Sequence, residues 1–215
     1  NPRLTDLPMP VPALRRRLEI AQLVRQLLSQ VDGLAPRSAV FDLANSLAAL
    51  MDEMQGEGVS ADVIADLDVT DQSGHWERAK TFINIAQSYI DLSQDTPDTE
   101  VRQRIIVHKL MEQWEETPPQ HPIILAGSTG SRGTTLLLMQ AIAKLPQGAV
   151  ILPGFDFDMP PPIWSSLSDA MLSEDHPQFR FHKLLQSLEK SPTDVQQWGD
   201  DTPAAPARNK LVSLA

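Results

Sequence analysis

A proline-rich stretch, Thr117–Pro122, divides the sequence into two parts with different hydrophobic patterns. Before it, apolar residues recur at the three-to-four residue spacing of amphipathic helices. After it, two short continuous apolar runs, 123–126 and 149–152, lie on either side of a stretch with helical character. Proline neither continues a helix nor donates to a sheet, so we expect no regular element to cross this break. The sequence therefore predicts two domains, residues 1–117 and residues 118–215.

The first part is predicted to be an antiparallel helical subdomain. One example is the stripe formed by Leu43, Leu47, Leu50 and Met54, which falls on a single helical face. Long amphipathic helices joined by short links favour antiparallel packing. The expected helices share this pattern and cover about 12–31, 37–55, 60–67, 73–93 and 97–116.

The second part is predicted to contain a small parallel β-α-β unit. A helix expected over 134–144 joins the two apolar runs, and strands connected through a helix run parallel in one sheet. Further helices are expected at about 162–173 and 178–190, and 199–207 has the composition of a loose linker. The predicted fold class is therefore mostly α with an α/β part.

Composition excludes several classes of function. The formal charge is −10, and residues 36–117 hold six basic and sixteen acidic side chains, which would repel a phosphate backbone. The absence of cysteine excludes disulfides, thiolate zinc sites, iron–sulfur clusters and a cysteine nucleophile within these residues. No apolar run approaches the roughly 18 residues that would span a bilayer, so we expect no membrane insertion and a cytoplasmic location.

The loop 127–133 follows a predicted strand and precedes a predicted helix, where backbone amides can bind an anion. The spacing departs from a Walker loop, because the next suitable glycine after Gly127 is Gly133, one residue too late, and Thr134 replaces the lysine. We therefore favour a tight strand-to-helix turn over a nucleotide site, with a weak phosphate contact as an intermediate possibility. The candidate phosphate-binding residues are those of the loop: Gly127, Ser128, Thr129, Gly130, Ser131 and Arg132.

Other chemistry-bearing residues give weaker signals. Asp156 and Asp158 could hold Mg²⁺, but no third ligand is evident in the sequence, so a loop or capping role is favoured. The five histidines lack zinc-binding spacing, and no serine lies in a nucleophile elbow, so we assign no metal ligand and no catalytic residue. The basic cluster Arg15, Arg16 and Arg17 could contact nucleic acid, or could be a solvated helix start with one arginine stacked on a neighbour.

Several ordered segments resemble AddB-type subunits of the bacterial helicase–nuclease that processes DNA double-strand breaks, specifically the alphaproteobacterial type. In the second part, these are residues 121–131, 141–154 and 176–179. In the first part, residues 14–18 and 51–59 are also similar. The likeness covers most of residues 10–200, and the ordered recurrence of its segments is more specific than any single motif.

The resemblance implies an internal piece of an N-terminal helicase-like region. Residues 1–117 would be its inserted helical subdomain, and residues 118–215 part of a core similar to P-loop NTPases. ATP with Mg²⁺ and an iron–sulfur cluster in a C-terminal exonuclease domain are implied for the complete complex, with no cofactor in this segment. The implied partners are DNA and the motor subunit AddA.

One departure bears on activity. In active helicases of this superfamily a core strand ends in acidic residues that hold Mg²⁺, whereas the run 123–126 ends in Ala126-Gly127. We therefore expect a non-catalytic segment that guides DNA in double-strand break repair and recombination. Two alternatives stay open: a divergent nucleotide-binding ATPase module that uses the 127–133 loop, and a protein-interaction scaffold whose acidic helical face docks on a basic partner.

Overall fold

The chain is mostly helical and contains a small parallel sheet of two strands, β1 and β2, as the sequence predicted. The computed structural model describes residues 7–30, 35–59, 97–130 and 133–199, together with the single residues 63, 89, 207, 210 and 211. Two compact units are present, Asn1–Leu110 and Met111–Ala215. The division falls inside the helix Thr99–Glu116, slightly before the break at 117–122.

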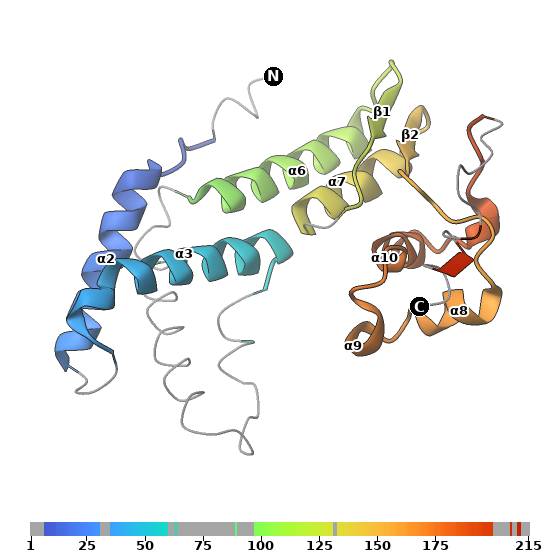
Figure 1. Cartoon of the computed structure of the whole chain (residues 1–215). Helices are drawn as coiled ribbons and strands as arrows, with labels where there is room; N and C mark the ends of the chain where they lie inside the picture. The colour runs from blue at the N-terminus through green and yellow to red at the C-terminus, as the bar shows by residue number, and fades with distance from the viewer. Residues whose placement is uncertain are drawn as a thin grey trace. The chain divides into compact units, whose positions relative to one another are not determined.

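The first unit contains helices α2 (Ala13–Gln30), α3 (Val40–Glu57) and the larger part of α6 (Thr99–Glu116), with a short 3₁₀ turn, η1 (Arg37–Ala39), directly before α3. Helices α2 and α3 lie side by side (Figure 1). The apolar stripe predicted for α3 is only partly buried: Leu47 and Met54 are buried and Leu43 is half-buried, whereas Leu50 is 37% exposed. The buried residues of this core are Ile20, Ala21, Val24, Leu28, Ala44, Leu47, Met51 and Tyr89.

The end of α3 differs from the prediction. The sequence places it near residue 55, before two glycines, but Gly56 lies inside the helix and is buried. Its carbonyl accepts a hydrogen bond from Arg104 Nη1 at 3.1 Å. The helix ends instead at Gly58, whose left-handed φ of 73° suits glycine. The helices expected over 60–67 and 73–93 lie outside the described residues, apart from Val63 and Tyr89.

The second unit is built around β1 (Ile123–Ala126), α7 (Gly133–Ala143) and β2 (Gly148–Ile151), which confirms the predicted strand–helix–strand order. The strands pair in parallel, with Ile123 opposite Gly148 and Ala126 opposite Ile151 (Figure 1). The core beneath them combines α7 with α10 (Phe179–Ser187). Its members are Leu136, Met139 and Leu184, with Leu125, Val150, Leu152 and Leu188 packed against them.

The helix predicted over 162–173 is two short helices, α8 (Pro161–Ser166) and α9 (Ala170–Ser173). Asp169 separates them, because its side chain accepts a hydrogen bond from Met171 N and so caps a new helix. The chain then passes through α10 to a second 3₁₀ turn, η2 (Pro192–Asp194). No helix among the described residues is long and apolar enough to cross a membrane.

Candidate functional site

The carboxyl ends of the two parallel strands lie at one edge of the sheet, and two loops leave from it. The first loop follows β1 at Gly127, and the second follows β2 after Ile151. Gly127 N donates a hydrogen bond of 3.4 Å to Ile151 O, which joins the two loops at their start. Ligands of open α/β sheets bind outside the carboxyl ends of strands, so this edge is the candidate site of the second unit.

The first loop has the geometry of a tight turn. Gly127 and Gly130 have φ values of 80° and 67°, which favour glycine. The amide of Gly130 donates to Ser128 Oγ at 3.2 Å, and Gly130 itself is buried. A Cβ on Gly130 would lie 3.0 Å from Met139 Sδ of α7. The amides of both glycines therefore have acceptors within the protein, in contrast to a phosphate loop, whose amides are aimed at the ligand.

The remaining candidate residues of this loop are only partly described. Thr129 is exposed beside the half-buried Ser128. Ser131 and Arg132 lie outside the described residues, so the phosphate contact suggested for them stays a prediction. The acidic side chain that Mg²⁺ chemistry would need is also missing from the end of β1, because the strand ends at Ala126 and its β2 partner is Ile151.

The second loop is held by Gln178, a buried residue that precedes α10. Its Oε1 accepts from Asp156 N at 3.1 Å, and its Nε2 donates to Gly154 O at 2.8 Å. The backbone amide of Gln178 donates to His176 Nδ1 at 3.1 Å, which fixes the residue from the other side. The side-chain amide thus fastens the loop after β2 to the start of α10. Sequence reasoning missed Gln178, because a single glutamine gives no signal of burial.

The two aspartates of this loop have a local role. Asp156 Oδ1 accepts a hydrogen bond from Asp158 N at 2.9 Å, which forms an Asx turn. This is the kind of loop role that the sequence favoured over a magnesium site. Across the described ranges, no group of three His, Cys, Asp or Glu side chains is placed to hold a metal ion.

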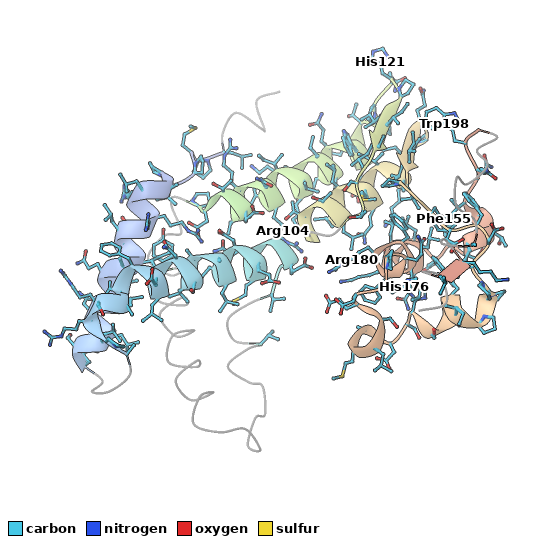
Figure 2. The ribbon with its side chains drawn as sticks, viewed as in Figure 1. Arg104, His121, Phe155, His176, Arg180 and Trp198 are labelled. Atoms are coloured by element: carbon cyan, nitrogen blue, oxygen red, sulfur yellow. The ribbon has the colours of Figure 1, made fainter. Side chains whose placement is uncertain are left out.

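Aromatic rings of this loop pack against rings of α8 and α10. Phe155 contacts Phe157 edge to face, with ring centroids 5.0 Å apart, and also packs on Trp164 and Phe181 at 5.7 and 6.1 Å (Figure 2). The ring centroids of His182 and Trp164 are 5.2 Å apart. Burial lowers the pKa of the His182 imidazole. These residues are spread over the sequence between 155 and 182, so the pattern gave no hint that the rings meet.

Replacing Gln178 with glutamate is expected to destabilise the second unit by about 2 kcal/mol, because a buried carboxylate would face the carbonyl of Gly154 without a proton to donate. Urea denaturation followed by tryptophan fluorescence measures this loss. Gln186→Glu, an exposed change on α10, the helix that Gln178 precedes, is the matched control and should change stability by less than about 0.5 kcal/mol. Equal midpoints for the two variants would show that the loop does not depend on Gln178.

The basic cluster at the start of α2 is engaged within the first unit. Arg15 Nε pairs with Glu19 at 2.8 Å, and the guanidinium of Arg17 lies 5.9 Å from the ring centroid of Phe41. This stacking corresponds to the alternative that the sequence left open. Arg15 and Arg17 stay accessible at the surface, and a contact of either with nucleic acid stays a prediction.

Arg16 has a different environment from its neighbours. Its side chain is 13% exposed and lies 2.9 Å from both Asp52 Oδ1 and Asp98 Oδ1. Asp98 is buried, and its other oxygen accepts from Gln55 Nε2 at 3.1 Å. Nearby, burial and then the charge of Asp98 raise the pKa of Tyr89 to about 12. The Arg16 guanidinium thus pairs with two carboxylates and exposes little surface to which a phosphate could bind.

Comparison with known proteins adds no relative: neither a family model, nor a curated protein, nor a solved structure matches this chain.

Proposed function

We propose that this chain is a non-catalytic, helicase-like segment of an AddAB-type helicase–nuclease, and that it guides DNA during double-strand break repair and recombination. The observation that carries the proposal is where the AddB-like segments fall. Residues 121–131 cover β1 and the turn after it, residues 141–154 cover β2 and its approach, and residues 176–179 contain Gln178. Three of the five resembling segments thus contribute to one edge of the sheet, and the other two, 14–18 and 51–59, lie in the first unit.

The same edge argues against ATP hydrolysis. A motor domain needs a phosphate loop with outward amides and a carboxylate that holds Mg²⁺. Here the amide of Gly130 is bonded to Ser128, and β1 ends at Ala126. A helicase-like scaffold without its own motor agrees with both features, and its partner AddA would supply the ATP-driven step.

Fluorescence anisotropy with single-stranded and forked DNA, with and without AddA, tests the proposal. We expect binding that weakens as salt rises, because phosphate contacts release counterions. The Arg15→Gln, Arg17→Gln double variant should bind more weakly than the wild type if the exposed arginines of α2 contribute. Absence of binding at low salt, in both settings, would contradict the proposal.

The same preparation separates the alternatives. A thermal shift with Mg-ATP that disappears in Arg132→Ala would favour a nucleotide-binding module. If charge reversal within residues 36–117 abolishes assembly with AddA while the chain shows no DNA affinity of its own, a protein-interaction scaffold would be the better description.

A further inference from the structure

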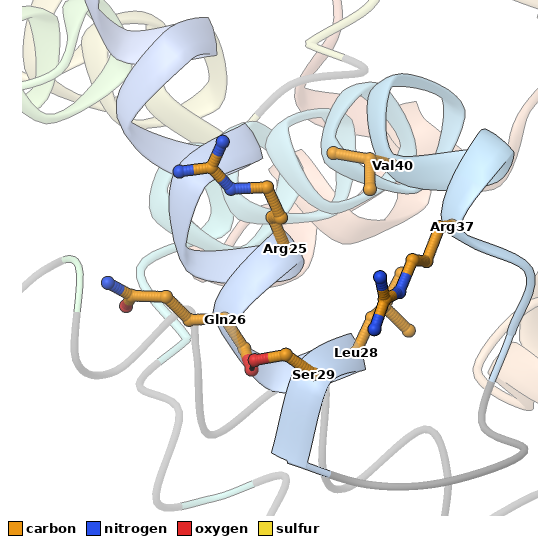
Figure 3. A pocket seen from close by; sticks show the side chains of 6 residues that line it. All are labelled: Arg25, Gln26, Leu28, Ser29, Arg37 and Val40. Carbon is orange, nitrogen blue, oxygen red and sulfur yellow. Dashed lines mark hydrogen bonds between the residues drawn. The ribbon is translucent and has the colours of Figure 1, made fainter.

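A pocket lies in the first unit where the end of α2 meets η1 and the start of α3. Its volume is about 340 Å³, which falls in the lower range of small-ligand sites. Its lining residues come from both sides of the junction and are Arg25, Gln26, Leu28, Ser29, Arg37 and Val40 (Figure 3). Residues 31–34, which join the two sides in the sequence, lie outside the described residues.

The two arginines of the pocket differ from the other arginines that the structure describes. Each of the others contacts a group of the protein: Arg15 with Glu19, Arg16 with Asp52 and Asp98, Arg17 with Phe41, Arg102 with Pro8 O, Arg104 with Gly56 O and Arg180 with Glu174. Arg25 and Arg37 have no hydrogen bond, ion pair or ring contact within the described ranges. In a chain with net charge −10, two arginines at one hollow whose described lining holds no carboxylate are a specific arrangement.

The floor of the pocket is apolar and fixed. Leu28 is buried in the core between α2 and α3, and Val40 packs against the same core. Figure 3 shows the side chain of Arg37 extending from η1 toward Leu28 of α2. Arg25 is exposed on α2, so its guanidinium can turn toward the pocket without breaking a contact. The pocket thus combines a floor that belongs to the core with two exposed arginines.

Further features of the pocket bear on the ligand that it could hold. The 3₁₀ turn η1, which leads directly into α3, has no side-chain hydrogen bond at its N-cap Pro36, so no side chain fills that corner of the pocket from Pro36. The hydroxyl of Ser29 donates a hydrogen bond to Gln26 O at 2.6 Å. The neutral polar groups that remain for a ligand are the lone pairs of Ser29 Oγ and the side-chain amide of Gln26. The carboxyl end of α2 also borders the pocket and carries a negative partial charge, so the arginines must provide the attraction.

We infer that this pocket binds a phosphate group between Arg25 and Arg37. Guanidinium groups form paired hydrogen bonds with phosphate oxygens, and two of them can hold one phosphodiester. The inference rests on the proposed function for the source of the phosphate, which is the backbone of single-stranded DNA. A free nucleotide carries the same group, and the experiment below includes it.

The test uses the full chain and the double variant Arg25→Gln, Arg37→Gln. The matched control is Lys183→Gln, Lys190→Gln, which removes the same charge from exposed positions of the second unit. Labelled single-stranded DNA is titrated by anisotropy at several salt concentrations. We expect the arginine variant to bind about tenfold more weakly at low salt and its salt slope to fall by roughly 1.4, since each single-strand phosphate contact contributes about 0.7. The control should change both much less.

The outcomes distinguish the pocket from the proposed function. Equal affinities for the arginine variant and the control would overturn the pocket and leave DNA guiding intact. If the wild type binds no DNA, the proposed function fails, and the pocket is then judged by titrating inorganic phosphate and AMP while recording the arginine Nε–H resonances by NMR. Shifts that disappear in the arginine variant would support a phosphate pocket for nucleotides, and unchanged spectra would overturn it. Circular dichroism should show both variants folded, because the exchanged side chains are exposed.

Discussion

Replacing Gly148 with alanine is expected to destabilise the second unit by about 3 kcal/mol, or to prevent its folding. A Cβ at this position would lie 1.8 Å from Ile142 O and 2.9 Å from Ile142 C, which are backbone atoms at the end of α7. A flexible side chain could move aside, but a helix backbone held by its hydrogen bonds cannot do so without moving the helix. Thermal and urea unfolding followed by circular dichroism measure the loss.

Ala149→Val is the control for Gly148→Ala. It enlarges the next residue of β2, whose side chain is exposed, and valine suits a strand. Its stability should stay within about 0.5 kcal/mol of the wild type. A Gly148→Ala protein that melts with the wild type would show that α7 and β2 are not packed as closely as the structure has them.

Replacing Arg16 with methionine is expected to cost about 3 kcal/mol of stability in the first unit. The substitution keeps most of the side-chain volume but leaves Asp98, 2% exposed, as a buried charge without its guanidinium partner, although Gln55 still donates to it. Arg16 Nε and Asp98 Oδ1 are 2.9 Å apart but not aligned as a hydrogen bond, so their attraction is mainly electrostatic. Denaturant titration, monitored by circular dichroism, reports the change.

Arg15→Met provides the comparison, because the Arg15–Glu19 pair is exposed and its loss should change stability far less than the loss of the Arg16 pairs. Adding Asp98→Asn to Arg16→Met should recover part of the loss, since it removes the uncompensated charge. If Arg15→Met and Arg16→Met are equally stable, the ion pairs of Arg16 do not hold the first unit together.

Most of the regular elements could be read from the sequence, because their signals are local. The helix expected over 12–31 is α2, the strand expected over 123–126 is β1, and the helix between the two strands is α7. One error has a local cause, because Asp169 caps a new helix within the stretch expected to be one helix. Another involves a distant residue: Gly56 lies inside α3, and Arg104, far along the chain, donates to its carbonyl.

The candidate site shows the same limit. The glycine spacing of 127–133 already disfavoured a Walker loop. In the structure the amide of Gly130 donates to Ser128 Oγ, so this amide is not directed at a ligand. Arg15, Arg16 and Arg17 are adjacent and chemically identical, yet one is nearly buried between two carboxylates while the others are at the surface. Their sequence neighbours carry no signal of that difference.

The sequence by itself determined the helical first part, the strand–helix–strand order and the absence of an acidic residue after β1, since periodicity and residue identity act within a few neighbours. Tertiary structure alone decided which arginine is buried with Asp98, which glutamine fastens the loop after β2 and which two arginines line one pocket. Each depends on side chains brought together from separate segments. Their burial and pairing therefore follow from packing, which local pattern does not encode.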